Sequence, residues 1–243
     1  MARLPRLHLA DIPQHIIQKG HNNLPCFFDE SDYLFYLESL KIAADQYKVE
    51  VHAYALLSNS VQLIATPRIS NAIASMMQSL GRRYVQYINH RYQRSGTLWS
   101  GRYKSSLIDS EAYLLSCYRY VELQPLYQGI TDSPEKYRWT SFHHHTQTKP
   151  NHLIYDHRLY HALGENKEDR ANHYRETFKQ VFDTRLKEFI AETVSMGKIL
   201  GDDKFKEKIE EIANIRLRPK KRGRPPKKKQ TTSNTDKHPT PVY

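Results

Sequence analysis

The chain has 243 residues, of which 39% are hydrophobic, and a formal net charge of +11. This length suits one medium domain with additions or two small domains. No apolar run approaches the roughly 18 residues of a membrane-spanning helix, so we expect no membrane partner. Residues 1–6 lack the apolar stretch of a secretory signal, and Cys26 and Cys117 are the only cysteines. These features argue against a disulfide framework or a cysteine-based zinc site and favour a cytoplasmic location.

The positive charge is concentrated near the C-terminus. Nine basic residues and no acidic residue lie between Arg216 and Lys229. The last fourteen residues are neutral, so nine of the eleven net charges belong to this run and residues 1–215 carry only +2. Such a run attracts polyanions. We favour a nucleic acid over an anionic membrane, because no amphipathic apolar face accompanies the charge, and over a merely solvated tail.

Residues 1–145 alternate between strand-like and helix-like patterns and are interpreted as one domain. Periodicity and turn residues predict strands over 11–20, 49–57, 61–66 and 103–108, and helices over 29–46, 70–92 and 110–124. The turn Ser58-Asn59 makes the two middle strands a hairpin, and Pro125 is expected to end the last helix. This order predicts an α+β, ferredoxin-like fold, in which helices cover one face of an antiparallel sheet.

The apolar positions of two helices in this domain indicate which side each one buries. For helix 29–46 they are Leu34, Leu37, Leu40, Ile42 and Ala44, and for helix 70–92 they are Ile73, Met77, Leu80, Tyr84 and Ile88.

Two further segments follow the first domain. Residues 150–215 predict a small helical segment, with helices over 167–182, 185–196 and 203–212 separated by Gly197 and Gly201. Residues 216–243 are rich in Pro, Lys and Thr, and we expect a basic tail that is disordered when unbound.

Five strings stand out by their order and spacing: PQHIIQKGHN (13–22), HAYALLSN (52–59), GRRYVQYIN (81–89), GTLWSGRYK (96–104) and YRYVELQP (118–125). Together they resemble the REP-associated tyrosine transposases, a branch of the HUH single-strand nucleases, over about residues 1–142. The resemblance implies an Mg²⁺ or Mn²⁺ ion held by a His-x-His pair and by an oxygen ligand four residues after a tyrosine. It also implies that the tyrosine attacks a DNA phosphate, that the substrates are single strands with hairpin repeats, and that homodimers form.

The tyrosine of this pattern is present. Tyr120 stands at the nucleophile position, and Gln124 supplies an amide oxygen at the ligand position. Residues four apart share one face of a helix, so both can reach the same phosphate. A phenol has a pKa of about 10 and needs a cation or a base to become a nucleophile. The alternative is that Tyr120 only packs its helix onto the sheet.

The histidine pair of this pattern is replaced. Where the family has Asn-His-Val-His, this chain has Asn59-Ser60-Val61-Gln62. Ser60 and Gln62 still share one face of a strand, and Gln62 can offer a carbonyl oxygen. The set of Ser60, Gln62 and Gln124 has no charge and no imidazole, so we expect weak binding of Mg²⁺ or Mn²⁺, or no cofactor at all. Cleavage should therefore be impaired or lost.

Other histidines are weaker candidates. His15 and His52 lie in family-like strings and are candidates for the cleft, although we favour a buried histidine bonded to the backbone for each. The triplet at positions 143–145 follows Trp139 in a predicted loop. Because consecutive loop residues seldom converge on one ion, we expect this triplet at the surface.

Residues 82–104 interleave cationic and aromatic side chains, a composition that suits phosphates and unpaired bases. The alternative is that the arginines only solvate a helix. The expected DNA contacts in the first domain are Asn59, Arg82, Arg83, Arg102 and Lys104.

The tail contains Arg222-Gly223-Arg224-Pro225, which resembles the core of an AT-hook. Arg222 and Arg224 are therefore expected in the minor groove of A/T-rich duplex DNA, with non-specific phosphate binding as the alternative.

The leading hypothesis is a transposase-family protein that binds single-stranded, hairpin-forming repeat DNA with impaired cleavage. One rival is a working enzyme that holds its metal with Gln62, Gln124 and His52. Another is a non-catalytic DNA-binding regulator in which the tail and the helical segment do the binding.

Overall fold

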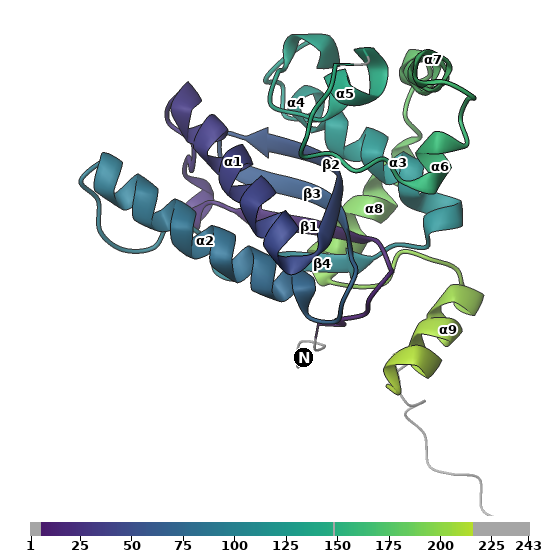
Figure 1. Cartoon of the computed structure of the whole chain (residues 1–243), viewed down its shortest axis with the longest axis horizontal. Helices are drawn as coiled ribbons and strands as arrows, with labels where there is room; N and C mark the ends of the chain where they lie inside the picture. Colours follow the sequence, from purple (N-terminus) through teal and green to yellow (C-terminus); the bar gives the residue numbers. More distant parts are fainter. Residues whose placement is uncertain (1–5, 148, 216–243) are drawn as a thin grey trace, which may run out of the picture.

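The computed structural model describes residues 6–147 and 149–215. A four-stranded antiparallel sheet lies at the centre, in the order β2-β3-β1-β4 (Figure 1). Its strands are β1 (Gln14–Lys19), β2 (Val49–Leu57), β3 (Ser60–Pro67) and β4 (Lys104–Leu107). The predicted α+β class, the order of elements through residue 122 and the hairpin are confirmed.

The first strand is shorter than the sequence predicts. Asp11 adopts a φ of 58°, a left-handed conformation outside the region that strands use, and β1 begins only at Gln14. Because β1 pairs with β3 on one side and with β4 on the other, its side chains lie beside those of both neighbours. Ile17, for example, is opposite Gln62 of β3 and Lys104 of β4.

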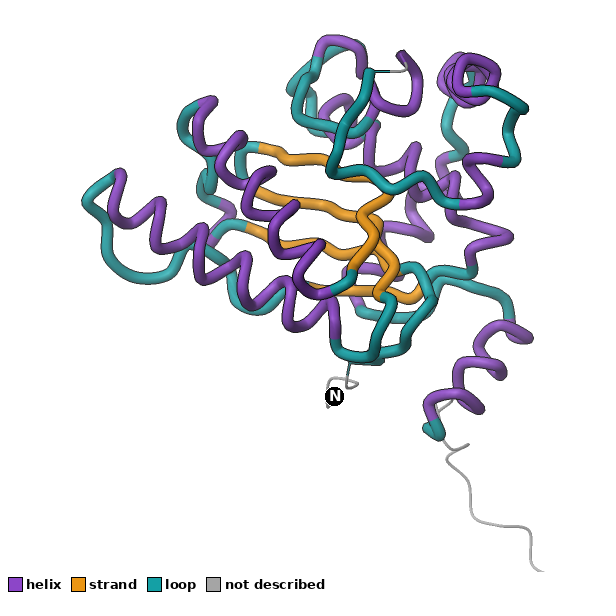
Figure 2. The backbone as a smooth tube through the Cα atoms, viewed as in Figure 1, coloured by secondary structure: helices purple, strands orange, loops and turns teal. Residues whose placement is uncertain are grey.

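One face of the sheet is covered by α1 (Glu30–Tyr47) and α2 (Ala72–Arg91), as Figure 2 shows. The predicted stripe of α2 is buried throughout. In α1, Leu40 and Ala44 are buried, whereas Leu34 is 51% and Ile42 is 41% exposed, so the predicted stripe of α1 is wrong at these two positions. Tyr36 and Ala43 are buried instead.

A second layer covers the opposite face of the sheet. Here α3 (Ser110–Glu122) packs against β2 and β3, and α8 (Thr184–Met196) packs against β4 and β1. α1 and α2 thus cover one face as expected, whereas α3, which the sequence predicts on the same face, lies on the opposite face together with α8 (Figure 1). The reason lies in the strands: in β3, Leu63 joins the core under α1 and α2, while Ile64 joins the core under α3. A sheet that is apolar on both faces has to be covered twice.

A second, short helix follows α3 almost directly. α3 ends at Glu122, and the short helix α4 (Gln124–Tyr127) follows at once, with Pro125 in its first turn. Pro125 was expected to end a helix, but here it starts one, because a proline in the first turn lacks only an N–H that would have no partner there. Gln124 therefore stays about one helical turn from Tyr120.

The remaining elements complete the molecule. They are the 3₁₀ turns η1 (His21–Asn23) and η2 (Pro134–Lys136), and the helices α5 (Phe142–Gln147), α6 (Arg158–His161), α7 (Lys167–Lys179) and α9 (Asp203–Ala213). Aromatic residues of α6 and α7 pack against α3 in a shared core, whereas α9 projects from the body (Figure 1). No helix within the described residues is long and apolar enough to cross a membrane. The predicted tail, with Arg222 and Arg224, lies outside the described residues.

Candidate functional site

A cleft of about 570 Å³ lies where β1, β3 and β4 meet α3, α4 and α8. Four residues that the sequence singles out for chemistry line it together: Ser60, Gln62, Tyr120 and Gln124. The strand spacing and the helical spacing thus bring these positions to one place, as the geometry of each element requires.

Tyr120 and Gln124 form the helical side of the cleft, and each is 6% exposed. The Gln124 amide nitrogen donates to the Tyr120 backbone carbonyl at 3.1 Å, which leaves the Gln124 carbonyl oxygen available to the cleft. Burial raises the pKa of Tyr120, and a hydrogen bond with the Gln124 side chain offsets this only in part. The phenol is therefore protonated at neutral pH.

His15 contacts two residues of the cleft and bonds to a side chain rather than to the backbone, which corrects the expectation for this residue. Its Nε2 donates to the Gln62 carbonyl oxygen at 3.0 Å, and its ring meets the Tyr120 ring edge-on at 5.7 Å. Burial lowers the pKa of His15 to about 4, with the bond to Gln62 acting in the opposite direction, so the imidazole is neutral at pH 7. Its Nδ1 is buried and has no partner within the described part of the chain.

The donors at the family's ligand positions do not fit a tight Mg²⁺ or Mn²⁺ site. The Ser60 hydroxyl donates to Asn59 Oδ1 at 3.2 Å, and the Gln62 oxygen already accepts from His15. None of these donors is charged, whereas oxygen sites for these ions usually include a carboxylate. Glu192, which also lines the cleft, is 57% exposed and bonds to Lys198 at 3.1 Å.

Two exposed lysines give the cleft positive charge. Lys104 of β4, an expected DNA contact, lines the cleft, and so does Lys19 of β1, which the sequence reasoning did not single out. Alternation along β1 places residues 15, 17 and 19 on one face, and that pattern was the available signal for Lys19. Asn59, another expected contact, also lines the cleft and donates to Asn23 Oδ1 at 3.0 Å.

The expected arginines lie elsewhere. Arg82 and Arg102 line a different groove, of about 610 Å³, beside α2 with Trp99 and Tyr103. That groove includes Gln18 of β1, whose side chain points to the opposite face of the sheet from Lys19. Arg83 is exposed on α2 and lines neither hollow. The structure therefore does not bring these arginines to Tyr120.

The other candidate histidines lie outside the cleft. His52 is buried, donates through Nδ1 to the Tyr155 carbonyl at 2.7 Å, and bonds through Nε2 to the Thr66 hydroxyl at 2.7 Å. Both ring nitrogens are therefore in use, and a metal-ligand role for His52 in the cleft is not supported. The expectation of a surface loop for the histidine triplet is wrong: it belongs to α5, and His145 is fully buried against Glu122 of α3.

Helix α8, which follows the first predicted domain in the chain, closes one side of the cleft with Ala191, Glu192 and Ser195. No spacing or motif in the sequence marks these three residues, because they reach the cleft only through the packing of α8 on β4 and β1.

Comparison with solved structures defines the class of fold. A structure of a REP-associated tyrosine transposase bound to a REP hairpin superposes with a TM-score of 0.54 at 12% identity, covering 65% of this chain and 93% of that one. The two proteins share a fold. A putative transposase from Deinococcus radiodurans R1 matches at 18% identity with a TM-score of 0.34, covering 49% of this chain and 95% of its own.

Comparison of the sequence finds a family match over part of the chain. Residues 10–124 match the family described as Transposase IS200 like, a range that contains Ser60, Gln62, Tyr120 and Gln124. Residues 10–124 therefore form an IS200-like transposase domain. No protein of curated function is significantly similar in sequence to this chain.

Proposed function

We propose that this chain binds single-stranded, hairpin-forming repeat DNA through the cleft and places a backbone phosphate beside Tyr120, with cleavage that is impaired. The observation that carries the proposal is that Tyr120 and Gln124, on the helical side, share one cleft with Lys19 and Lys104, on the sheet. A phenol and two cations around one hollow suit a phosphodiester better than a neutral substrate.

Each residue has a distinct part in this proposal. The two lysines attract the DNA backbone, because phosphate contacts supply most of the affinity for single strands. The amides of Asn23 and Asn59 can bond to sugar or base edges. In a cleavage of the family type, the Tyr120 oxygen would bond to phosphorus and the strand would leave with a free 3′-hydroxyl.

Two features of the cleft support impaired cleavage. The pKa of the nucleophile is raised by burial, so little phenolate forms at neutral pH. Ser60 and Gln62 also supply no imidazole nitrogen to hold the cation that would stabilise the phenolate and the phosphate. A catalytic metal contributes several kcal/mol to such transition states, so the rate should be lower than with a histidine pair by about 10³-fold or more.

The decisive experiment restores the histidine pair. The doubly substituted protein Ser60→His, Gln62→His, incubated with a labelled hairpin oligonucleotide and Mn²⁺, should form a covalent protein–DNA adduct on denaturing gels. The wild type should form little adduct while binding the same hairpin in the presence of a chelator. Adding Tyr120→Phe should abolish the adduct, whereas Tyr113→Phe on the same helix should not, because Tyr113 packs against Phe189 outside the cleft.

Two outcomes would contradict the proposal. If the restored protein binds hairpin DNA but forms no adduct, the two replaced histidines are not the cause of impairment. If the wild type already forms the adduct as fast as the restored protein, cleavage is not impaired. In that case the chain is a working enzyme.

The basic run between Arg216 and Lys229 favours a second candidate function, that of a non-catalytic DNA-binding regulator. In that case Arg222 and Arg224 would hold A/T-rich duplex DNA in its minor groove. A chain that lacks residues 216–243 should keep hairpin binding if the cleft recognises the hairpin, although with lower affinity and weaker salt dependence. Complete loss of hairpin binding on this deletion would favour the regulator.

A further inference from the structure

A second group of ligand-type side chains lies beside α3, away from the cleft. Its anchor on α3 is Glu122, two residues after Tyr120. Positions two apart on a helix point about 200° away from each other, so Glu122 faces away from the nucleophile position. Opposite Glu122 stand His144 and His145 of α5 and Asp156, which precedes α6.

Three residues of this group lie close enough together to share one metal ion. One ligand atom from each of His144, His145 and Asp156 lies within 4.8 Å of the others. His144 Nε2 and Asp156 Oδ1 are 2.9 Å apart. Ligand atoms about 2.0–2.2 Å from a tetrahedral Zn²⁺ are separated by roughly 3.3 Å, so shifts of about an ångström would bring these three into place.

His145 carries a ring nitrogen that no group in the described chain satisfies. Its Nδ1 donates to Glu122 Oε1 at 2.6 Å, and both side chains are completely buried. Its Nε2 is buried and has no partner. A neutral ring leaves a lone pair there without a donor, and a charged ring leaves an N–H without an acceptor. A metal ion satisfies this nitrogen, and a carboxylate on the other nitrogen is the usual support of a metal-bound histidine.

The charge of Glu122 points in the same direction. Its carboxylate accepts from the Ser141 hydroxyl at 2.6 Å and from the Tyr174 hydroxyl at 2.9 Å, as well as from His145. With a neutral His145, all three donors are neutral, and a buried carboxylate is costly unless a cation is near. A divalent ion on His145 would balance Glu122 and Asp156 together.

We propose that His144, His145 and Asp156 bind a transition-metal ion, Zn²⁺ in the first place, with Glu122 supporting His145. Imidazole nitrogen favours Zn²⁺ over Mg²⁺. The ion replaces the proton that His144 Nε2 shares with Asp156. That single ring proton moves to Nδ1, so His144 stays neutral, and the 3.3 Å contact from the Asn151 N–H to that atom is given up.

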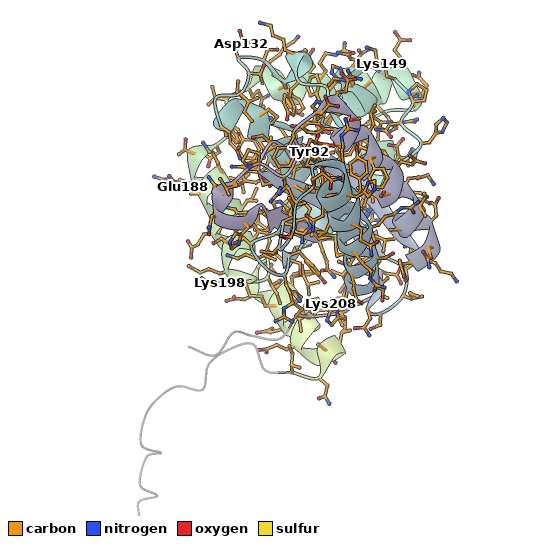
Figure 3. The ribbon with its side chains drawn as sticks, turned by 90° about the vertical axis from the view of Figure 1, so that its left-hand side faces the viewer. Tyr92, Asp132, Lys149, Glu188, Lys198 and Lys208 are labelled. Carbon is orange, nitrogen blue, oxygen red and sulfur yellow. The ribbon has the colours of Figure 1, made fainter. Side chains whose placement is uncertain are left out.

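The proposed ion is structural rather than catalytic. It would join α5 and the segment before α6 to the end of α3, the helix that carries Tyr120. His144 lines a hollow of about 430 Å³ together with Lys149, which Figure 3 labels at the upper edge of the molecule, so an ion can approach the group from the side of His144. Asp156 lines a second hollow. The proposal does not depend on the proposed function, since neither DNA nor Tyr120 takes part.

The test uses full-length protein without an affinity tag, stripped with a chelator and dialysed against Zn²⁺. The number of zinc ions bound per chain is measured by elemental mass spectrometry, and the affinity for Zn²⁺ is measured by competition with a chromophoric chelator. The substitutions His144→Gln and Asp156→Asn remove one ligand each. His143→Gln is the matched control, since His143 lies on the same helix and is not one of the three proposed ligands.

The wild type and the control should each bind one tight equivalent of Zn²⁺, and the two ligand variants should bind it at least about 10-fold more weakly. Free Zn²⁺ at about 100 times the Kd should raise the melting temperature of the wild type by roughly 5–10 °C. Should a variant fail to fold, Co²⁺ bound to the wild type decides: a tetrahedral d–d spectrum supports the site, and an octahedral spectrum overturns it. Absence of tight binding, or equal binding in all four proteins, also overturns the proposal.

Discussion

Replacing Glu122 by alanine tests how much the buried carboxylate contributes to stability. The substitution leaves the donors of His145, Ser141 and Tyr174 without their acceptor, all in a region with no solvent access at Glu122. A buried donor that loses its partner costs about 1–3 kcal/mol. Three such donors, partly relieved by entering water, give an expected loss of about 3–5 kcal/mol. This is a large share of the roughly 5–15 kcal/mol that holds a domain of ordinary stability together.

The assay is urea denaturation followed by circular dichroism at pH 7 in the presence of a chelator. Glu122→Gln should cost less than the alanine variant, because the amide keeps one acceptor oxygen and the side-chain volume. Glu111→Gln on the same helix is the control, and it should leave the midpoint nearly unchanged, since Glu111 is 61% exposed in its pair with Arg158. An alanine variant at position 122 that unfolds at the same urea concentration as this control would refute the reasoning.

Three further predictions concern acid, the first turn and salt. Burial lowers the pKa values of His15 and His52 to about 4, so the unfolded chain takes up protons first as the pH falls below 6.5. The neutral histidines make their full contribution to the free energy of unfolding above pH 6.5, and this contribution is lost as the pH falls towards 4. Lowering the pH from 7 to 5 should therefore reduce the free energy of unfolding, measured by urea denaturation, by about 2 kcal/mol per histidine. Gly20→Ala should destabilise the fold by about 1–3 kcal/mol and weaken hairpin binding, because its Cβ would lie 2.2 Å from the Leu24 carbonyl oxygen. Lys19→Ala and Lys104→Ala should each lower the slope of log affinity against log salt concentration for a single strand by about 0.7 in filter binding.

Each of these has a matched control. His52→Gln should flatten the dependence of stability on pH, and an unchanged profile would mean that His52 does not titrate as the burial implies. Gly129→Ala should not weaken hairpin binding, because a Cβ there would meet open space and Gly129 does not line the cleft, although its φ of 67° adds local strain. Lys208→Ala on α9 should leave the slope of log affinity against log salt concentration unchanged. An equal decrease of the slope in this variant would mean that Lys19 and Lys104 do not contact the DNA more closely than other lysines do.

The helices show how far periodicity can predict burial. The stripe of α2 was predictable because its apolar residues fall on one side of the helix. In α1 large apolar residues occur on several sides, and packing against α2 and the sheet selects Tyr36 and Leu40 while Leu34 remains exposed. The sequence contains the candidates for burial, but the neighbouring element decides among them.

The candidate site was likewise predictable only in part from the sequence. Local spacing alone was enough to place positions 60 and 62, and positions 120 and 124, on shared faces. The contributions of α8 and the bond from His15 to Gln62 depend on contacts between distant segments, which no spacing encodes. The same holds for His145, whose partner Glu122 is 23 residues away. A histidine triplet is expected at the surface unless the buried carboxylate that pairs with it is known.

The second layer behind the sheet has a practical consequence for anyone who shortens this protein. Tyr160, Tyr174 and Ile190 fill the core on the α3 side together with Ala53 and Ile64 of the sheet. A fragment ending at residue 145, the end of the first predicted domain, would expose this apolar surface to water. Exposed apolar patches of this kind promote self-association. The first predicted domain should therefore precipitate when it is expressed alone. The helices that follow it keep it soluble by covering this surface.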